Sequence, residues 1–280
     1  MTKSHAFAGF TLIEMIMVIT ITGIIAAAVA VFIRHPVQGY VDSVRRAELT
    51  DAADVALRRM TRDVRLALPN SLRTVTNGFE FIMTKSGGRY RDPTDGSNCA
   101  TANCISFTDA LVKTFDILGT SPTNPPEIAN GDFVVIYNLG PGHAPSDAYS
   151  ATAQKNITAV TVTAGTPYTI TMGTNVFASQ IPPLPSPSAR FQVVGAADKV
   201  VRYECTGGIM TRYSGCDFAN TASGCTAAVL AGSAMTPATC TIDYASAATG
   251  RNGLLYIALT LTSGGESLSL FSQIHVDNSP

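Results

Sequence analysis

The chain has 280 residues, which is long enough for one large domain or two of moderate size. Charged residues make up only 14% of it, a low share for a cytosolic enzyme. The formal net charge of −1 gives the whole molecule no electrostatic attraction for nucleic acid, so we expect no nucleic-acid partner.

An apolar segment runs from Phe10 to Ile33 and contains one charged residue, Glu14. As a helix it would be about 36 Å long, enough to cross a hydrocarbon core of about 30 Å. A secretory signal would carry its small-residue cleavage site after the apolar stretch, but here Ala6-Phe7-Ala8 precedes it. Because charged residues inside membrane segments usually have a functional partner, Glu14 is a candidate functional residue.

The stretch Gly9-Phe10-Thr11-Leu12-Ile13-Glu14, followed by the apolar segment, resembles the N-terminus of type IV prepilins and pseudopilins. The resemblance implies that prepilin peptidase cleaves between Gly9 and Phe10 and methylates the new amine of Phe10. It also implies that Glu14 receives the N-terminal amine of a neighbouring subunit, because two buried opposite charges are tolerable together and costly apart. The implied organisation is a leader at 1–9, a membrane and filament-core helix at 10–33, an amphipathic helix at 34–69 and a β-rich head at 70–280.

The basic residues that flank the apolar segment disagree with this motif about orientation. Lys3 precedes the segment, whereas Arg34, Arg45 and Arg46 follow it. The positive-inside rule alone would therefore place the C-terminal part in the cytoplasm. The motif and the cysteines both require that part outside. We expect a single-pass protein of the bacterial inner membrane with its head in the periplasm, or a subunit in the pilus filament or at its tip.

Pro36 and Gly39 predict a bend or break after the apolar segment, and an amphipathic helix is predicted to follow and to end at Pro69. Its apolar residues recur at intervals of three and four, at Leu49, Ala53, Ala56, Met60, Val64 and Ala67. The i,i+4 spacing predicts ion pairs between Asp54 and Arg58 and between Arg59 and Asp63.

The same helix carries Arg58, Arg59, Arg62 and Arg65. DNA binding is one interpretation, and a solvated face or salt bridges between subunits is the other. We favour the second, because charge runs on helices are mostly solvated. No aromatic residues alternate with these arginines to stack on bases.

The remainder is predicted to be largely antiparallel β-structure lying on the helix, so the predicted fold class is α+β and, by the resemblance, type IV pilin-like. The strand-like stretches are GFEFIMT, CISFT, DFVVIYNL, ITAVTV, YTITM, RFQVV, KVVRYEC, IMTRYS, GLLYIALTLT and ESLSLFSQIHV. Hairpin turns are predicted at Gly207-Gly208 and at Ser263-Gly264-Gly265. The proline-rich stretch QIPPLPSPS is predicted to be an extended loop.

None of the six cysteines forms a C-x-x-C pair, which favours disulfides in an oxidising compartment over zinc ligands. Cys99 is expected to pair with Cys104 across a short loop. Two patterns are open for the other four. One joins Cys205 to Cys240 and Cys216 to Cys225; the other joins Cys205 to Cys216 and Cys225 to Cys240. The first is preferred and the second stays open.

Three later stretches, RRMTRDVRLALPNSLR, VRYECTGGIMTRYSG and SQIHVDNSP, resemble the O-type minor prepilins of mannose-sensitive haemagglutinin (MSHA) pilus biogenesis. The first also resembles J-type minor pseudopilins. The resemblance implies a structural protein, not an enzyme, whose partners are prepilin peptidase, other major and minor pilins, the inner-membrane assembly platform and membrane lipid. The alternatives are a tip-binding or DNA-binding minor pilin and a pseudopilin of a type II secretion system.

The sequence contains no standard catalytic motif and we expect no cofactor. The stretch RDPTDGSN, with Asp92, Asp95 and Asn98, is similar to an oxygen-rich calcium loop but lacks the spacing of one. A turn is the preferred interpretation and a small calcium site is the alternative.

Overall fold

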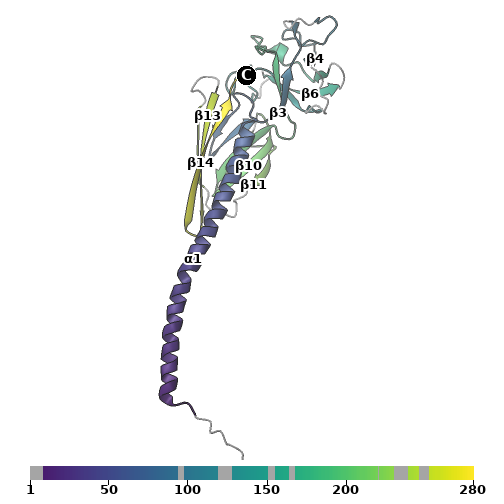
Figure 1. Ribbon diagram of the computed structural model, residues 1–280. Helices are drawn as coiled ribbons and strands as arrows, with labels where there is room; N and C mark the ends of the chain where they lie inside the picture. The colour runs from purple at the N-terminus through teal and green to yellow at the C-terminus, as the bar shows by residue number, and fades with distance from the viewer. Residues whose placement is uncertain are drawn as a thin grey trace, which may run out of the picture. The chain divides into compact units, whose positions relative to one another are not determined.

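The computed structural model describes residues 9–93, 98–118, 128–150, 155–163, 168–219, 221–229, 239–245 and 252–280, without the side chains of residues 34–36 and 228–229. The chain divides into two compact units, Met1–Glu48 and Leu49–Pro280. The first unit contains the N-terminal part of one long helix. The second contains the rest of that helix and all of the described strands (Figure 1).

The helix α1 (Leu12–Val64) is a single element of 53 residues. The break that we expected at Pro36 and Gly39 does not occur. A proline inside a helix removes only one backbone donor. Here the helical turns before and after Pro36 remain continuous. The hydroxyl of Ser43 also donates to the carbonyl of Gly39 at 2.8 Å, one turn away.

The C-terminal end of α1 lies at Val64, before the Pro69 that was predicted to stop it. The reason is a change of backbone partner. The N–H of Leu68 donates to the carbonyl of Ile82 at 2.8 Å, and the carbonyl of Leu66 accepts from the N–H of Thr84 at 2.7 Å. The backbone groups of Leu66 and Leu68 therefore bond to the segment from Ile82 to Thr84 and do not extend the helix.

The described strands form three sheets in which every pair of neighbours is antiparallel. The five-stranded sheet has the order β1 (Arg73–Val75), β2 (Gly78–Ile82), β9 (Val200–Thr206), β10 (Ile209–Cys216), β11 (Thr226–Val229). The three-stranded sheet has the order β12 (Thr239–Ala245), β13 (Asn252–Ser263), β14 (Glu266–Asp277). The six-stranded sheet has the order β3 (Thr84–Arg89), β8 (Arg190–Val194), β5 (Phe133–Val135), β6 (Ile157–Thr163), β7 (Thr169–Met172), β4 (Thr114–Asp116).

Both predicted hairpins are confirmed. Gly207 and Gly208 join β9 to β10, with φ of 61° and 80°, and Thr206 pairs with Ile209 across them. Gly264 and Gly265 join β13 to β14, with φ of 56° and 89°. Positive φ at both central residues is the geometry of the tight turn that matches the twist of the strands, and glycine adopts it without strain.

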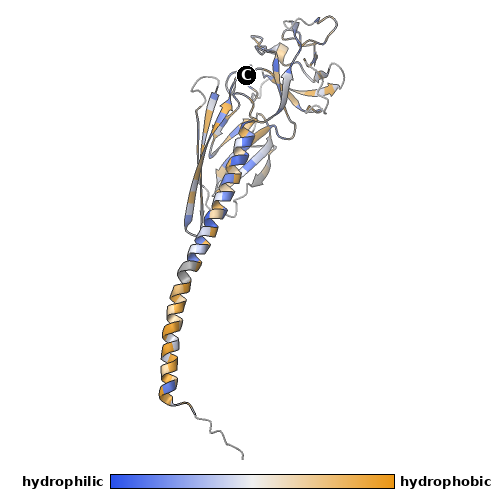
Figure 2. Cartoon of the chain, viewed as in Figure 1, coloured by the Kyte–Doolittle hydropathy of each residue, from blue (hydrophilic) through white to orange (hydrophobic). Residues whose placement is uncertain are grey.

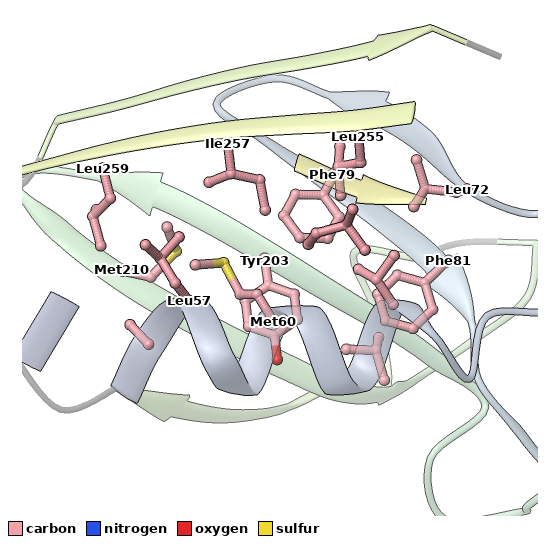
Figure 3. Packing of buried hydrophobic residues seen from close by; sticks show 14 of the residues in the cluster. Leu57, Met60, Leu72, Phe79, Phe81, Tyr203, Met210, Leu255, Ile257 and Leu259 are labelled. Atoms are coloured by element: carbon pink, nitrogen blue, oxygen red, sulfur yellow. The ribbon is translucent and has the colours of Figure 1, made fainter. Parts of the chain in front are cut away.

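The principal core of the second unit is enclosed by α1, the five-stranded sheet and the three-stranded sheet. Figure 3 shows Leu57 and Met60 of the helix facing Phe79, Tyr203 and Ile257 of the strands. The amphipathic spacing is confirmed for Leu49, Ala53, Ala56, Met60 and Val64, which are all buried, whereas the sixth predicted position, Ala67, lies after the helix and is partly buried. The alternating side chains of β13, at Leu255, Ile257, Leu259 and Leu261, are buried on the same core. Apolar burial of this kind is the main stabilising contribution to such a unit.

The side chain of Asp63 connects the helix to the five-stranded sheet through hydrogen bonds. Its carboxylate accepts from the hydroxyl of Tyr203 at 2.7 Å and from Nε of Arg212 at 2.8 Å. The predicted pair between Arg59 and Asp63 is therefore wrong, because Asp63 is buried and finds its cation inside the unit. The predicted pair between Asp54 and Arg58 is confirmed at 2.6 Å on the exposed side of the helix.

A second core lies in the six-stranded sheet, around Phe115, Ile170, Phe177 and Phe191. The stretch CISFT, predicted as a strand, is irregular here. The hydroxyl of Ser106 accepts from the N–H groups of Thr108 and Asp109 at 3.3 and 2.9 Å, which turns the backbone out of an extended conformation. The proline-rich stretch after Gln180 contains no helix or strand, in agreement with the predicted loop.

Three disulfides close the β-rich unit: Cys99–Cys104, Cys205–Cys240 and Cys216–Cys225. These are the pairs of the first pattern considered above. Cys205–Cys240 joins β9 to β12 and so connects the five-stranded sheet to the three-stranded one. The fold class is α+β, with a long N-terminal helix packed with antiparallel sheets, and it is consistent with a pilin-like fold.

Candidate functional site

The candidate site begins with the residues just before α1. Gly9, Phe10 and Thr11 precede the first helical residue and are exposed, with Phe10 77% accessible. Nothing lies within 4 Å of the position that a Cβ would take at Gly9. The peptide bond between Gly9 and Phe10 is therefore open to an enzyme, and the local structure does not itself require a glycine there.

Thr11 caps the start of the helix. Its hydroxyl oxygen accepts from the N–H of Glu14 at 3.4 Å, and its carbonyl accepts from the N–H groups of Glu14 and Met15 at 3.2 Å each. The sequence Thr-x-x-Glu has the spacing of a capping box, in which the Glu carboxylate would return to the N–H of the threonine. A structural role in capping is thus the alternative to a functional role for Glu14.

The hydrogen bonds of the described residues form only one half of the capping box. They include the bond from the Glu14 N–H to Thr11 but none to the Glu14 carboxylate, which is exposed. Near the N-terminus of a helix a negative charge is favoured by the helix dipole. The helix therefore places Glu14 in its first turn, with the carboxylate exposed.

Between Glu14 and Ile33, the helix is apolar on all sides. The large hydrophobic residues from Leu12 to Ile33 are exposed, and Figure 2 shows this part of α1 as hydrophobic almost throughout. The hydroxyl of Thr20 donates to the carbonyl of Ile16 at 3.0 Å, and that of Thr22 to the carbonyl of Val18 at 2.6 Å. A helix that is apolar all round and satisfies its own hydroxyl groups suits lipid or the interior of a helix bundle.

Among the described residues, α1 is the one helix that is long and apolar enough to cross a membrane. Residues 4–30 match the family described as the prokaryotic N-terminal methylation motif. No curated protein and no solved structure matches the chain. The motif supports the type IV prepilin and pseudopilin class, and together with the apolar helix it fits a membrane-anchored pilin. It suggests a structural protein, and it implies processing by prepilin peptidase and assembly with other pilins.

The structure brings three of the predicted site residues, Gly9, Phe10 and Glu14, together at the start of α1. The cysteines lie in the other unit, as disulfides. Lys3 and Asp95 fall outside the described residues. Within the described part of the chain, no three His, Cys, Asp or Glu side chains are close enough to hold a metal ion.

Two features of the structure were missed from the sequence. The capping role of Thr11 was readable from the Thr-x-x-Glu spacing. The second feature had no local signal: Phe271 of β14 lies beside the exposed arginines of α1, and together they line one groove. An aromatic side chain does accompany the arginines, but it comes from a distant part of the sequence.

Proposed function

We propose that this chain is a minor prepilin of a type IV pilus of the MSHA type, which primes or joins the filament after processing. The observation that carries the proposal is the exposed Gly9–Phe10 peptide bond placed immediately before an apolar helix whose first turn holds a single carboxylate. The family match to residues 4–30 supports the broader class, and the three stretches quoted above support the MSHA type.

The processing step would be hydrolysis of the Gly9–Phe10 bond, followed by methylation of the amine at Phe10. Since the space around Gly9 would admit a side chain, the glycine serves the peptidase rather than the fold. Cleavage removes the leader and leaves a positive amine next to the apolar helix. That charge is costly to bury alone.

The assembly step would pair this amine with Glu14 of a neighbouring subunit. Contact between the apolar surfaces of helices such as Leu12–Ile33 removes hydrocarbon from lipid or water but does not fix their axial position, because the apolar side chains surround the helix. One buried charge pair fixes it, since any other alignment leaves both charges unpaired. Glu14 would therefore set the register between subunits.

The chain would cross the inner membrane once, with Leu49–Pro280 on the periplasmic side until assembly. The three disulfides support this side, because they persist in an oxidising compartment. The partners would be prepilin peptidase, the assembly platform of the inner membrane and other pilins.

The processing proposal is tested by the intact mass of the protein purified from cells with and without prepilin peptidase. We expect a mature chain that begins at Phe10 and carries one added methyl group, and the full chain from Met1 in cells without the enzyme. Gly9→Ala should retain the fold and lose most of the cleavage. A full-length chain in cells with active peptidase would contradict the proposal.

The assembly proposal is tested with Glu14→Ala. We expect normal cleavage but loss of the chain from sheared filaments, because the neighbour's amine then has no partner. Thr22→Val is the matched control, since the Thr22 hydroxyl is bonded within its own helix and should be dispensable. Normal incorporation of the Glu14→Ala chain would refute the pairing. If deletion of the gene stops protein secretion and leaves pili intact, the chain is a secretion pseudopilin instead.

A further inference from the structure

The strand β14 is a free edge of the three-stranded sheet. It pairs with β13 over all twelve residues, Glu266 to Asp277, without a bulge or shift of register. Its sequence, ESLSLFSQIHVD, contains no Lys, Arg or Pro. Natural edge strands are usually short, bulged, covered or marked by lysine or proline, because an open edge is a template for another strand. β14 contains neither of these protective residues, lysine or proline.

The outward hydrogen-bonding groups of β14 can be assigned from the turn. A two-residue hairpin closes on a hydrogen-bonded pair, here Ser263 and Glu266, and the pairs then alternate. The even-numbered residues of β14 therefore bond to β13. The odd-numbered residues direct their N–H and C=O groups away from the sheet: Ser267, Ser269, Phe271, Gln273 and His275.

The side chains agree with this assignment. Thr260 and Ser269 contact each other through their hydroxyl groups at 2.7 Å, as do Thr262 and Ser267 at 2.9 Å. Such close contact is typical of the non-hydrogen-bonded pairs. Within the described part of the chain, no backbone hydrogen bond connects the odd-numbered residues from Ser267 to His275 to any other segment.

A groove of about 650 Å³ lies between this edge and α1. It is lined by Arg58 and Arg62 of the helix, by Arg65 directly after the helix, and by Phe271 of the strand, which is 75% exposed. Arg58 is paired with Asp54, whereas no ion pair of Arg62 or Arg65 occurs among the described residues. The groove thus combines an open strand edge, an exposed aromatic ring and two uncompensated positive charges.

We propose that this groove binds an extended segment of a partner protein that adds to the edge of β14 and carries acidic side chains toward the arginines. The backbone of the segment would bond to the outward groups of Ser269, Phe271 and Gln273. Its carboxylates would meet Arg62 and Arg65, and its apolar residues would cover Phe271. Strand addition of this kind takes affinity from the backbone and specificity from alternate side chains.

Charge and backbone hydrogen bonding favour this occupant over two others. In a pair of identical chains joined along β14, two sets of arginines would flank one edge, which the like charges oppose. A nucleic acid would use the arginines and stack on Phe271, but it would leave the alternating N–H and C=O groups of β14 unpaired. An acidic polypeptide would pair both with the arginines and with the outward backbone groups of β14. The inference does not depend on the proposed function, because it concerns β14 and the C-terminal end of α1 rather than Gly9, Phe10 or Glu14.

The test measures binding of synthetic peptides to the full chain in detergent. The probe is a nine-residue peptide of alternating Asp and Val, and its control is the same peptide with Lys in place of Asp. Two further probes carry N-methyl groups on one or the other alternating set of backbone amides. We expect the Asp peptide to bind and the Lys peptide not to bind. One N-methylated peptide should bind and the other should fail, because only one set of amides faces β14.

Variants of the protein locate the site. Arg62→Glu with Arg65→Glu should weaken the Asp peptide at least about tenfold and gain affinity for the Lys peptide. Arg59→Glu is the matched control, since Arg59 is exposed on the same helix but does not line the groove. Phe271→Pro removes an outward N–H without removing a bond to β13, and it should abolish binding. Phe271→Ala keeps that N–H and should weaken binding less.

Three results would overturn the proposal. Equal binding of both N-methylated peptides would show that the edge is not used. Self-association of the full chain that is lost in Phe271→Pro would make a second copy the occupant. Binding of oligothymidylate that Phe271→Pro leaves unchanged, but that the double arginine variant abolishes, would make the groove a nucleic-acid site.

Discussion

Asp63 illustrates how burial decides the partner of a charged residue. The i,i+4 spacing on the helix pointed to Arg59, but Asp63 lies on the buried face next to Met60 and Val64. A buried carboxylate needs a buried cation, and Arg212 of β10 supplies it. Burial, and after it the neighbouring carboxylate, raises the pKa of Tyr203, so its hydroxyl stays protonated and donates to Asp63.

Removal of this carboxylate should destabilise the β-rich unit strongly. Asp63→Ala leaves the guanidinium of Arg212 buried without a counter-charge, and we expect a loss of about 3 kcal/mol or more in the free energy of unfolding. Tyr203→Phe removes one hydrogen bond to the same carboxylate and should cost about 1–2 kcal/mol. Denaturant titration followed by tyrosine fluorescence measures both, since the chain has no Trp. Arg58→Ala breaks only an exposed pair, so a loss as large as that of Asp63→Ala would contradict the argument.

At the scale of the strands, prediction succeeded for long segments with alternating apolar residues, and it failed for the short segment CISFT. The long alternating strands β13 and β14 and both glycine turns were predicted correctly. The strand β3, TKSGGR, was not, because two glycines have little strand preference. The structure explains them: a Cβ at Gly88 would meet the ring of Phe191 at 2.8 Å, and one at Gly87 would meet the carbonyl of Phe191 at 2.9 Å. At Gly87 the backbone of the neighbouring strand leaves no room for a Cβ, and at Gly88 the buried ring of Phe191 would have to move.

The disulfide between β9 and β12 should be the most stabilising of the three. It closes a loop with a sequence separation of 35, compared with 5 for Cys99–Cys104. From loop length alone, replacing Cys205 and Cys240 by Ser should cost about 4 kcal/mol, and replacing Cys99 and Cys104 about 2 kcal/mol.

Thermal unfolding of the two double variants tests this order, and digestion without reductant tests the pairs themselves. An equal or larger loss for the Cys99 and Cys104 variant would contradict the argument. Peptides joined through Cys205–Cys216 and Cys225–Cys240 would replace the pattern seen here with the second one.

At the scale of the whole molecule, the two candidate sites differ in how far the sequence could reveal them. Gly9, Phe10 and Glu14 are neighbours in sequence, so a short motif is enough to find them. The groove beside β14 joins Arg62 to Phe271, residues that only the folded unit brings together. No local pattern could have indicated it. The direction of membrane insertion also does not follow from one local pattern, because the arginines after the apolar segment and the N-terminal motif indicate opposite directions.

A cysteine placed at Leu111 should settle the direction. Leu111 is 87% exposed, so Leu111→Cys gives a reactive thiol on the surface of the β-rich unit. If this unit lies in the periplasm, a maleimide that cannot cross the inner membrane should label the thiol in cells whose outer membrane alone is permeable. Ala6→Cys in cells without prepilin peptidase is the control and should react only after lysis. Labelling of Ala6→Cys before lysis and of Leu111→Cys only after it would reverse the proposed topology.

The hydroxyl groups of Thr20 and Thr22, bonded within their own helix, have a consequence for movement between environments. A polar group that is already satisfied does not exchange partners when its surroundings change from hydrocarbon to protein. If the helix leaves the bilayer to enter a bundle, Glu14 is the one charged side chain between Phe10 and Ile33, so its electrostatic energy depends most on the surroundings. The electrostatic change on such a transfer would therefore be concentrated in the first turn of the helix, at the carboxylate.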